Sequence, residues 1–367
     1  MKKDQRDVSV LLFLKTRNQD VVIGKLCSRK QFLPHEIIFE ILSWLPAESL
    51  LRFKCVCKEW YYLIQDRDFI KKHLSRTPLL MVYDEDERAG LSISGTIQET
   101  FTRIDHVSGV ILEKGDLSHN YRIRNPITRQ ILFLPDPHKG TVEISIYRCQ
   151  STYEFKLVSI YRDKKTSGMQ GFEILTIDVD DKWRSLKLLG SQECRMNLEI
   201  LRKTHKAIYY DDGTDFYGDV YCLDVETECF FINTLPQGLF SDLSKVLAVD
   251  WDGCLAYADI VEEKLNVIVL EDYRKHRWSQ RKIIVPLAFL REIQITDDNF
   301  LAPVIFHSNK LYFLLLDDKL FVYDIQLRKI TETNPVSWEN KSLYTMRHSL
   351  VTFKDMQPEK IPPATDF

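Results

Sequence analysis

Carboxylates are the side chains of this chain whose spacing most suggests chemistry. Adjacent aspartates occur at several positions, for example at 180–181, 211–212 and 317–318, and paired carboxylates could bind a calcium ion through their oxygens. None of the three pairs fits the loop of an EF-hand, whereas aspartate is common in the solvated turns of hairpins. We therefore expect turns at these positions rather than metal sites.

The other groups that could carry chemistry are scattered. The nine histidines and eight cysteines form no H-E-x-x-H motif, no C-x-x-C pair and no cluster at zinc-ligand spacing. No G-x-S-x-G elbow, P-loop or G-x-G-x-x-G motif occurs. Residues 273–278 (YRKHRW) could bind nucleic acid or a phosphopeptide, but they also fit a hairpin turn followed by an inward-packed tryptophan. The sequence therefore predicts no catalytic residue, no cofactor and no metal, and indicates a protein that is not an enzyme.

The composition is that of a soluble globular protein, with 44% hydrophobic and 28% charged residues. A net charge of −3 gives no strong attraction to nucleic acid or to anionic lipid. No apolar stretch approaches the length of a membrane span. The apolar run Val8–Leu14 is short, ends at Lys15 and lacks the cleavage site of a signal peptide. We expect no nucleic-acid or membrane partner, and a location in the cytoplasm, the nucleus or both.

The elements that would position a binding surface begin with two helical patterns in residues 33–64. Apolar residues recur at helical spacing on one side of the first pattern, and they are Ile37, Ile38, Ile41, Leu42 and Leu45. The second pattern starts at Pro46, which a first helical turn tolerates, and runs unbroken to Ile64. A third helix would be capped by Asp68 and would end before Pro78.

This stretch resembles the F-box, a three-helix module that docks a substrate receptor onto a Skp-family adaptor in a cullin–RING ubiquitin ligase. The resemblance rests on three groups in register: LP-x-E from Leu33, LP-x-x-SLLR from Leu45 and VCK-x-W from Val56. The residues that it places mainly at the adaptor face are Leu33, Pro34, Ile37, Leu45, Pro46 and Leu50. It gives shared core and interface roles to Ile41, Val56 and Trp60. The full set of contact residues that it implies is Leu33, Pro34, Ile37, Ile41, Leu42, Leu45, Pro46, Leu50, Leu51, Val56 and Trp60.

From Leu79 onward, short apolar runs alternate with turns rich in aspartate and asparagine, which is typical of antiparallel β-structure. One polar turn residue marks each unit of a loose repeat: Asn125, Asp178, Asp224, Asp272 and Asp324. Their spacings of 46 to 53 residues match a four-stranded propeller blade of about 40–50 residues. In the last unit, polar turns at 308–309 and 317–318 separate apolar strands. Residues 79–83 and 349–353 could pair and close a sixth blade from the two ends of the domain.

The predicted fold class is α+β: an N-terminal three-helix F-box followed by an all-β, propeller-like domain of five to six blades. Through residues 122–135, 172–186 and 348–353, the β region resembles the F-box-associated domain of plant F-box proteins, including the S-locus-like and kelch-type groups. The lack of any Gly-Gly pair departs from true kelch blades. The expected domains are an unassigned extension at 1–30, the F-box at 31–78, the β domain at 79–355 and a flexible tail at 356–367.

The resemblance implies a substrate-recognition subunit of a Skp–cullin–F-box ubiquitin ligase. Its F-box would bind the Skp-family adaptor and reach cullin indirectly, while the β domain captures a target protein and so raises the effective concentration of a target lysine. Two alternatives stay open: an F-box scaffold that works outside ubiquitination, and a propeller enzyme or sugar-binding module with a helical appendage. Loops carry recognition surfaces without a general code, so the target and the residues that bind it stay unknown.

Overall fold

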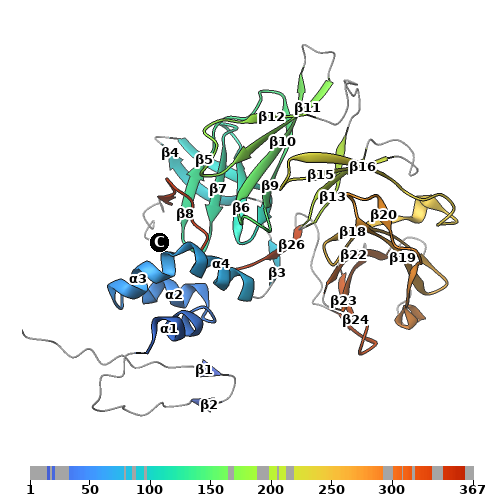
Figure 1. Ribbon diagram of the computed structural model, residues 1–367, viewed down its shortest axis with the longest axis horizontal. Coiled ribbons are helices and arrows are strands. Elements are labelled where there is room, and N and C mark those ends of the chain that lie inside the picture. Colours follow the sequence, from blue (N-terminus) through green and yellow to red (C-terminus); the bar gives the residue numbers. More distant parts are fainter. Residues whose placement is uncertain are drawn as a thin grey trace, which may run out of the picture. The chain divides into compact units, whose positions relative to one another are not determined.

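The structure of the chain, a computed structural model, contains two compact units, residues 1–42 and 43–367 (Figure 1). In the first unit, β1 (Lys15–Thr16) pairs with β2 (Gln19–Asp20), and α1 spans His35–Leu42. The rest of the extension at 1–30, including the apolar run from Val8, lies outside the described residues. The described residues are 15–16, 19–20, 33–77, 80–84, 88–94, 97–163, 169–187, 198–204, 206–211, 219–291, 301–307, 309–315, 319–332 and 342–359.

Three helices begin the second unit, and they are α2 (Ala47–Phe53), α3 (Lys58–Gln65) and α4 (Arg67–Arg76). Together with α1, the described residues hold four α-helices, so the prediction of three is wrong. The extra helix arises because the pattern expected to run from Pro46 to Ile64 breaks after Phe53. Cys57 is extended there, and its Sγ accepts a hydrogen bond from the Trp60 N–H at 3.5 Å. This bond satisfies an N–H group at the start of a new helix.

A single residue, Asp66, both ends α3 and caps α4. Its Oδ1 accepts hydrogen bonds from the backbone N–H groups of Asp68 at 2.9 Å and Phe69 at 3.1 Å. A carboxylate at this position satisfies N–H groups that have no partner within the helix. The predicted cap, Asp68, is therefore wrong by two residues, and it lies in the first turn of α4.

The β region consists of sheets whose strands mostly follow one another along the chain. The first sheet contains β4 (Arg88–Ser94), β5 (Ile97–Val107), β6 (Val110–Gly115), β7 (Tyr121–Asn125), β8 (Gln130–Phe133) and β27 (Gln357–Pro358). The second contains β9 (Thr141–Arg148), β10 (Phe155–Asp163), β11 (Met169–Thr176) and β12 (Arg184–Leu186). The third contains β13 (Glu199–Lys203), β14 (Ile208–Asp211), β15 (Asp219–Asp224) and β16 (Cys229–Thr234).

A fourth sheet of nine strands joins two units of the repeat, because β17 and β22 pair in parallel. Its first half is β17 (Leu247–Trp251), β18 (Cys254–Val261), β19 (Lys264–Asp272), β20 (Arg277–Trp278) and β21 (Ile283–Pro286). Its second half is β22 (Leu301–His307), β23 (Lys310–Leu315), β24 (Lys319–Asp324) and β25 (Lys329–Glu332). The strands expected in the last unit are therefore present. Position 308 and positions 317–318 of its turns lie outside the described residues.

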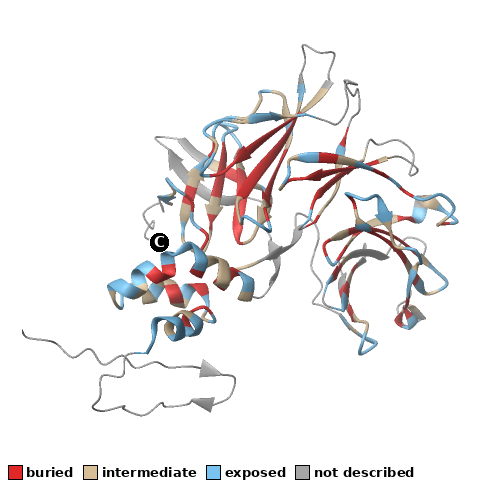
Figure 2. Cartoon of the chain, in the orientation of Figure 1, coloured by how far each residue is buried: buried red, intermediate tan, exposed pale blue. Residues whose placement is uncertain are grey.

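Each sheet packs on the next one along the chain, and a separate apolar core fills each junction. Ile123 of the first sheet shares a core with Leu157 of the second, and Ile174 of the second shares one with Leu223 of the third. The third and fourth sheets, and the two halves of the fourth, are joined in the same way. Figure 2 shows the buried positions concentrated along these strands. Stacked four-stranded sheets are the arrangement of propeller blades, but the described strands do not by themselves define a closed ring, and the number of blades stays a prediction.

The predicted repeat has a physical basis in one shape of turn. At four markers the side-chain Oδ1 accepts hydrogen bonds of 2.9–3.3 Å from N–H groups two or three residues later, and these markers are Asn125, Asp224, Asp272 and Asp324. The fourth residue after each marker has a φ between 49° and 58°, and these residues are Arg129, Glu228, His276 and Arg328. Each turn joins two neighbouring antiparallel strands of its sheet, and these pairs are β7 and β8, β15 and β16, β19 and β20, and β24 and β25. Asp178 is the exception, because Asp180 accepts the N–H bond in its unit, from Thr176 at 2.8 Å.

The two ends of the β region come together, but not through the residues that were predicted. β3 (Leu80–Asp84) pairs antiparallel with β26 (Ser342–Met346), so the N-terminal strand does find a C-terminal partner. The predicted partner, 349–353, is not a strand. Its side chains Val351 and Phe353 are instead buried in the core between the first two sheets. The apolar residues of this segment are buried, as their residue types indicate, but the prediction that the segment forms a strand was wrong.

Asn125 attaches this C-terminal segment to the first sheet. Its Nδ2 donates hydrogen bonds to the carbonyl oxygens of Ser349 at 3.1 Å and Val351 at 2.8 Å. Beyond them, β27 pairs with β8, in a region where a flexible tail was expected from residue 356. The chain therefore continues the first sheet with residues from its far end, while residues 360–367 lie outside the described part.

Candidate protein-docking surface

The apolar side chains at α1 that the sequence singled out are mostly exposed. Leu33, which is 53% exposed, is followed at four-residue spacing by Ile37 and Ile41, which are also exposed. Ile37 and Ile41 lie one turn apart on one side of α1, and Leu33 lies just before the helix begins. Pro34 precedes α1, and its carbonyl oxygen accepts the N–H of Ile37 at 3.0 Å, which fixes the first turn. An exposed apolar row of this kind marks a surface that a partner would cover.

The helices of the second unit carry another group of exposed apolar side chains. Two of them, Pro46 and Val56, belong to the predicted contact set. Sequence reasoning missed three exposed aromatic residues, and these are Trp44, Tyr61 and Tyr62. Figure 2 shows how much of the surface of α2 and α3 is exposed. The remaining predicted residues of this unit that keep partial exposure are Leu45, Leu51 and Trp60.

Two residues of the predicted contact set lie in the interior instead. Leu42 is 1% exposed and Leu50 is 0% exposed, so neither side chain is available to a partner of the folded chain, and we remove both from the set. The reason is physical: helices of seven to ten residues are not stable alone in water and need a core. In the second unit Leu63, Ile64 and Phe69 are buried in the same way. The other nine residues of the set stay a prediction.

The missed aromatic residues did leave a signal in the sequence. Tyr61 and Tyr62 directly precede the buried pair at 63–64, so they fall outside the apolar stripe of α3. Their rings meet edge to face, with centroids 5.5 Å apart. Trp44 is 68% exposed, and the guanidinium of Arg76 lies 4.3 Å from its ring centroid. Large aromatic side chains on the polar side of a short helix are enriched where proteins bind one another.

Polar contacts fix α2 and α4 on the β region within the second unit. His348 Nδ1 lies 2.6 Å from Glu48 Oε1 on α2. Arg347 Nη1 donates a hydrogen bond to the carbonyl oxygen of Leu74 on α4 at 3.0 Å, and the Leu74 side chain is part of the core between the first two sheets. These helices and the β sheets therefore form one connected body. A protein that holds one partner at a set distance from another requires such a connection.

The helices also contain a buried histidine. The Nε2 atom of His73 lies 2.9 Å from the carbonyl oxygen of Leu45, and its Nδ1 lies 3.4 Å from the hydroxyl of Thr77. Burial lowers the pKa of His73, because charging the ring inside the protein costs solvation energy. The neutral ring thus links the end of α4 to the loop that precedes α2.

The other groups considered for chemistry have structural roles where they are described. Asp180 pairs with Arg184 at 3.1 Å, while Asp212 and positions 317–318 lie outside the described residues. In the 273–278 segment, Trp278 stacks on Tyr257 with ring centroids 5.9 Å apart, as the hairpin interpretation predicts. Within the described part of the chain, no three histidine, cysteine or acidic side chains gather closely enough to hold a metal. None of the helices described there has both the length and the apolar character needed to cross a bilayer.

Comparison with known proteins agrees with this arrangement of helices and sheets. The F-box domain family matches residues 31–72, and the F-box associated beta propeller domain family matches residues 72–355. A putative F-box protein of Arabidopsis thaliana is 24% identical over 340 residues, which cover 80% of this chain and 82% of that protein. A second F-box protein of the same plant is 24% identical over 292 residues and 67% of each chain.

The solved structures that match this chain are much more distant. A chain from the nidogen/laminin complex covers 74% of this chain and all of its own length, with 10% sequence identity and a TM-score of 0.40. A likeness at this level carries no argument about function.

Proposed function

The chain belongs to the F-box proteins that carry an F-box associated beta propeller domain, and on this basis we propose that it recognises substrates for an F-box complex. The F-box helices bind a Skp-family adaptor, which connects the chain to cullin, and the β domain binds the protein to be modified. The chain supplies no catalytic group, because its task is to hold a target lysine near a ubiquitin-loaded enzyme. It works in the cytoplasm, the nucleus or both.

The observation that supports the adaptor contact is the exposed apolar surface of the F-box helices. Leu33, Ile37 and Ile41 of the first unit and Pro46 and Val56 of the second keep large apolar areas in water. Fully burying one leucine or isoleucine side chain contributes about 1.5–3 kcal/mol. A few such side chains are enough for tight docking when the helices are already folded.

Replacing Leu33 and Ile37 together with aspartate tests the adaptor contact. Both side chains are exposed, so the double variant should keep its fold, unlike any charge placed at the buried Leu50. Loss of two buried apolar contacts, each of at least about 1.5 kcal/mol, predicts binding weaker by about 100-fold or more. Isothermal titration with a purified Skp-family adaptor measures this change.

The matched control is Leu327→Asp, which charges an exposed leucine on a turn of the β region. It should bind the adaptor as the wild type does. Equal adaptor affinity of the double variant and the control would show that this surface does not dock the adaptor. Copurification of cullin with the wild-type complex separates a ligase subunit from an F-box scaffold, for which adaptor without cullin is expected.

A further inference from the structure

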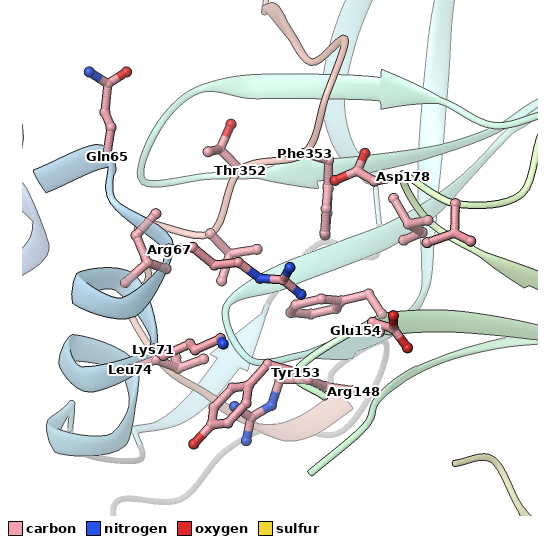
Figure 3. A pocket seen from close by; sticks show the side chains of 15 residues that line it. Gln65, Arg67, Lys71, Leu74, Arg148, Tyr153, Glu154, Asp178, Thr352 and Phe353 are labelled. Atoms are coloured by element: carbon pink, nitrogen blue, oxygen red, sulfur yellow. The ribbon is translucent and has the colours of Figure 1, made fainter. Parts of the chain in front are cut away.

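A pocket of about 330 Å³ lies between α4 and the β region, within the second unit (Figure 3). This volume falls in the range of about 300–1,000 Å³ that is common for small-molecule sites. The pocket has an apolar base that is continuous with the core between the first two sheets. The base is formed by Ile70, Leu74, Phe155, Ile177, Val351 and Phe353.

Cationic side chains line one part of the pocket, and these are Arg67, Lys71 and Arg148. The ring of Tyr153 lies between two of them: its centroid is 5.0 Å from the Lys71 ammonium and 5.1 Å from the Arg148 guanidinium. Figure 3 shows Lys71, Tyr153 and Arg148 together at one end. Lys71 has one carboxylate partner, the solvent-exposed Asp68 at 3.5 Å. Positive charge is therefore gathered beside an apolar surface.

Two carboxylates line the pocket with these three cations, and the charge of Arg67 acts on one of them, Asp178. Asp178 accepts a backbone N–H at 2.9 Å and Glu154 accepts a hydroxyl at 3.0 Å, and Asp178 lies away from Tyr153 in Figure 3. Among the residues that the structure describes, no carboxylate lies within 4.0 Å of the Arg148 guanidinium. Burial lowers the pKa of Arg148, and the charge of Arg347 lowers it further. An anion in the pocket would compensate this charge.

The loop that carries Tyr153 is held in an unusual conformation. Tyr153 has a φ of 60°, in the left-handed region that bulky residues rarely adopt. The loop is closed by a hydrogen bond from the Cys149 N–H to the Glu154 carbonyl at 2.8 Å, and Arg67 of α4 donates to the Thr152 carbonyl at 3.3 Å. Backbone strain of this kind persists where the surroundings enforce it, and it is found more often at binding sites.

We propose that this pocket binds a small organic anion, with its carboxylate or phosphate group on Arg148 and Lys71 and its apolar body against Phe155 and Phe353. Arginine matches both kinds of acid group with paired, charge-assisted hydrogen bonds. Because α4 and the β sheets both line the pocket, the bound molecule stabilises the connection between the F-box helices and the target-binding region. A metabolite that binds in the pocket thereby regulates how firmly the F-box helices are held against the β sheets.

Titration of the full-length chain with four probes tests this inference. The probes are phenyl phosphate, benzoate, benzyl alcohol and inorganic phosphate. Calorimetry measures the binding of each probe, and the thermal midpoint of unfolding measures its effect on stability. At least one aromatic anion should bind and raise the midpoint, and the neutral alcohol and inorganic phosphate should bind about tenfold more weakly or worse, since each lacks one half of the recognition. The tighter of the two aromatic anions identifies whether the site prefers phosphate or carboxylate. Absence of binding by both anions, or equal binding of benzyl alcohol, overturns the proposal.

Charge-removing variants locate the site. Arg148→Gln and Lys71→Gln should each weaken binding of the aromatic anion by about tenfold, because one charge-assisted hydrogen bond is lost. Arg328→Gln, at an exposed turn of the β region, is the matched control and should leave binding unchanged. If Arg148→Gln does not fold, Lys71→Gln at the partly exposed α4 site decides the question. Equal weakening by the control, or none by Lys71→Gln, overturns the assignment. Adaptor binding is measured separately, so failure here leaves the docking proposal standing.

Discussion

Replacing Asn125 with alanine tests how the C-terminal segment is attached to the first sheet. The Asn125 side chain is completely buried. Its Nδ2 donates to the carbonyl oxygens of Ser349 at 3.1 Å and Val351 at 2.8 Å. Its Oδ1 accepts from the N–H groups of Ile127 at 3.0 Å and Thr128 at 3.3 Å. Alanine removes all four hydrogen bonds at once.

The cost follows from the groups that lose their partners. A buried polar group left without a hydrogen bond costs about 1–3 kcal/mol, so the two carbonyls of the C-terminal segment should cost about 2–6 kcal/mol together. Loss of the turn bonds adds about 1 kcal/mol, by analogy with a lost helix cap. The expected loss of about 3–7 kcal/mol is a large part of the ~5–15 kcal/mol that stabilises a typical domain. Urea unfolding of the full-length chain measures it.

Asp272→Ala is the matched control, because Asp272 has the same place in its turn. Its Oδ1 accepts from the N–H groups of Arg274 at 3.1 Å and Lys275 at 3.2 Å, and it attaches no distant segment there. It should lose only about 1 kcal/mol. Limited proteolysis should also cut residues 349–359 faster in Asn125→Ala than in Asp272→Ala. Equal losses of stability and equal cleavage would refute the reasoning that Asn125 anchors the segment.

Two further predictions concern histidines. Burial holds the pKa of His73 below its ordinary value. The unfolded chain therefore takes up the proton first as the pH falls. The stability that the neutral ring contributes is present above about pH 6.5 and is lost as the pH falls below it. His73→Gln should therefore reduce the change in unfolding free energy between pH 7 and pH 5, measured by urea unfolding at each pH, and a slope equal to that of the wild type would contradict this. His276 has a φ of 52° in an exposed turn, and His276→Gly should raise the unfolding free energy by up to about 1 kcal/mol relative to His276→Ala, because glycine adopts this conformation without strain. A lower thermal midpoint for the glycine variant than for the alanine variant would exclude that explanation.

The sequence predicted the features that depend on neighbouring residues. The markers at Asn125, Asp224, Asp272 and Asp324 could be found because each unit uses the same kind of turn. In each turn a single Asp or Asn side chain accepts the backbone N–H groups, so this residue type recurs once in each unit. The exposed residues at α1 were singled out by the resemblance to the F-box, which rests on short motifs such as LP-x-E from Leu33. Both signals are complete within a few residues, so they can be read from a single chain.

The features that the sequence did not predict depend on contacts between distant residues or on rare local chemistry. Cys57 as a helix cap was missed because a thiol is an uncommon acceptor at that position. The apolar stripe could not separate buried Leu50 from exposed Val56, since core and contact residues share one periodicity. The segment 349–353 was assigned as a strand because its partner, Asn125, lies more than 200 residues away in the chain, where no local pattern can indicate it.

The attachment of the C-terminal segment has a consequence for synthesis on the ribosome. Residues 110–134 form strands of the first sheet, yet their apolar core contains Val351 and Phe353, and β8 gains its outer partner only from Gln357–Pro358. The nascent chain therefore cannot complete the sheet of β4–β8 until residues 351–358 have been translated. A product that ends before Val351 leaves that core unfinished, with apolar surface open to chaperones and proteases.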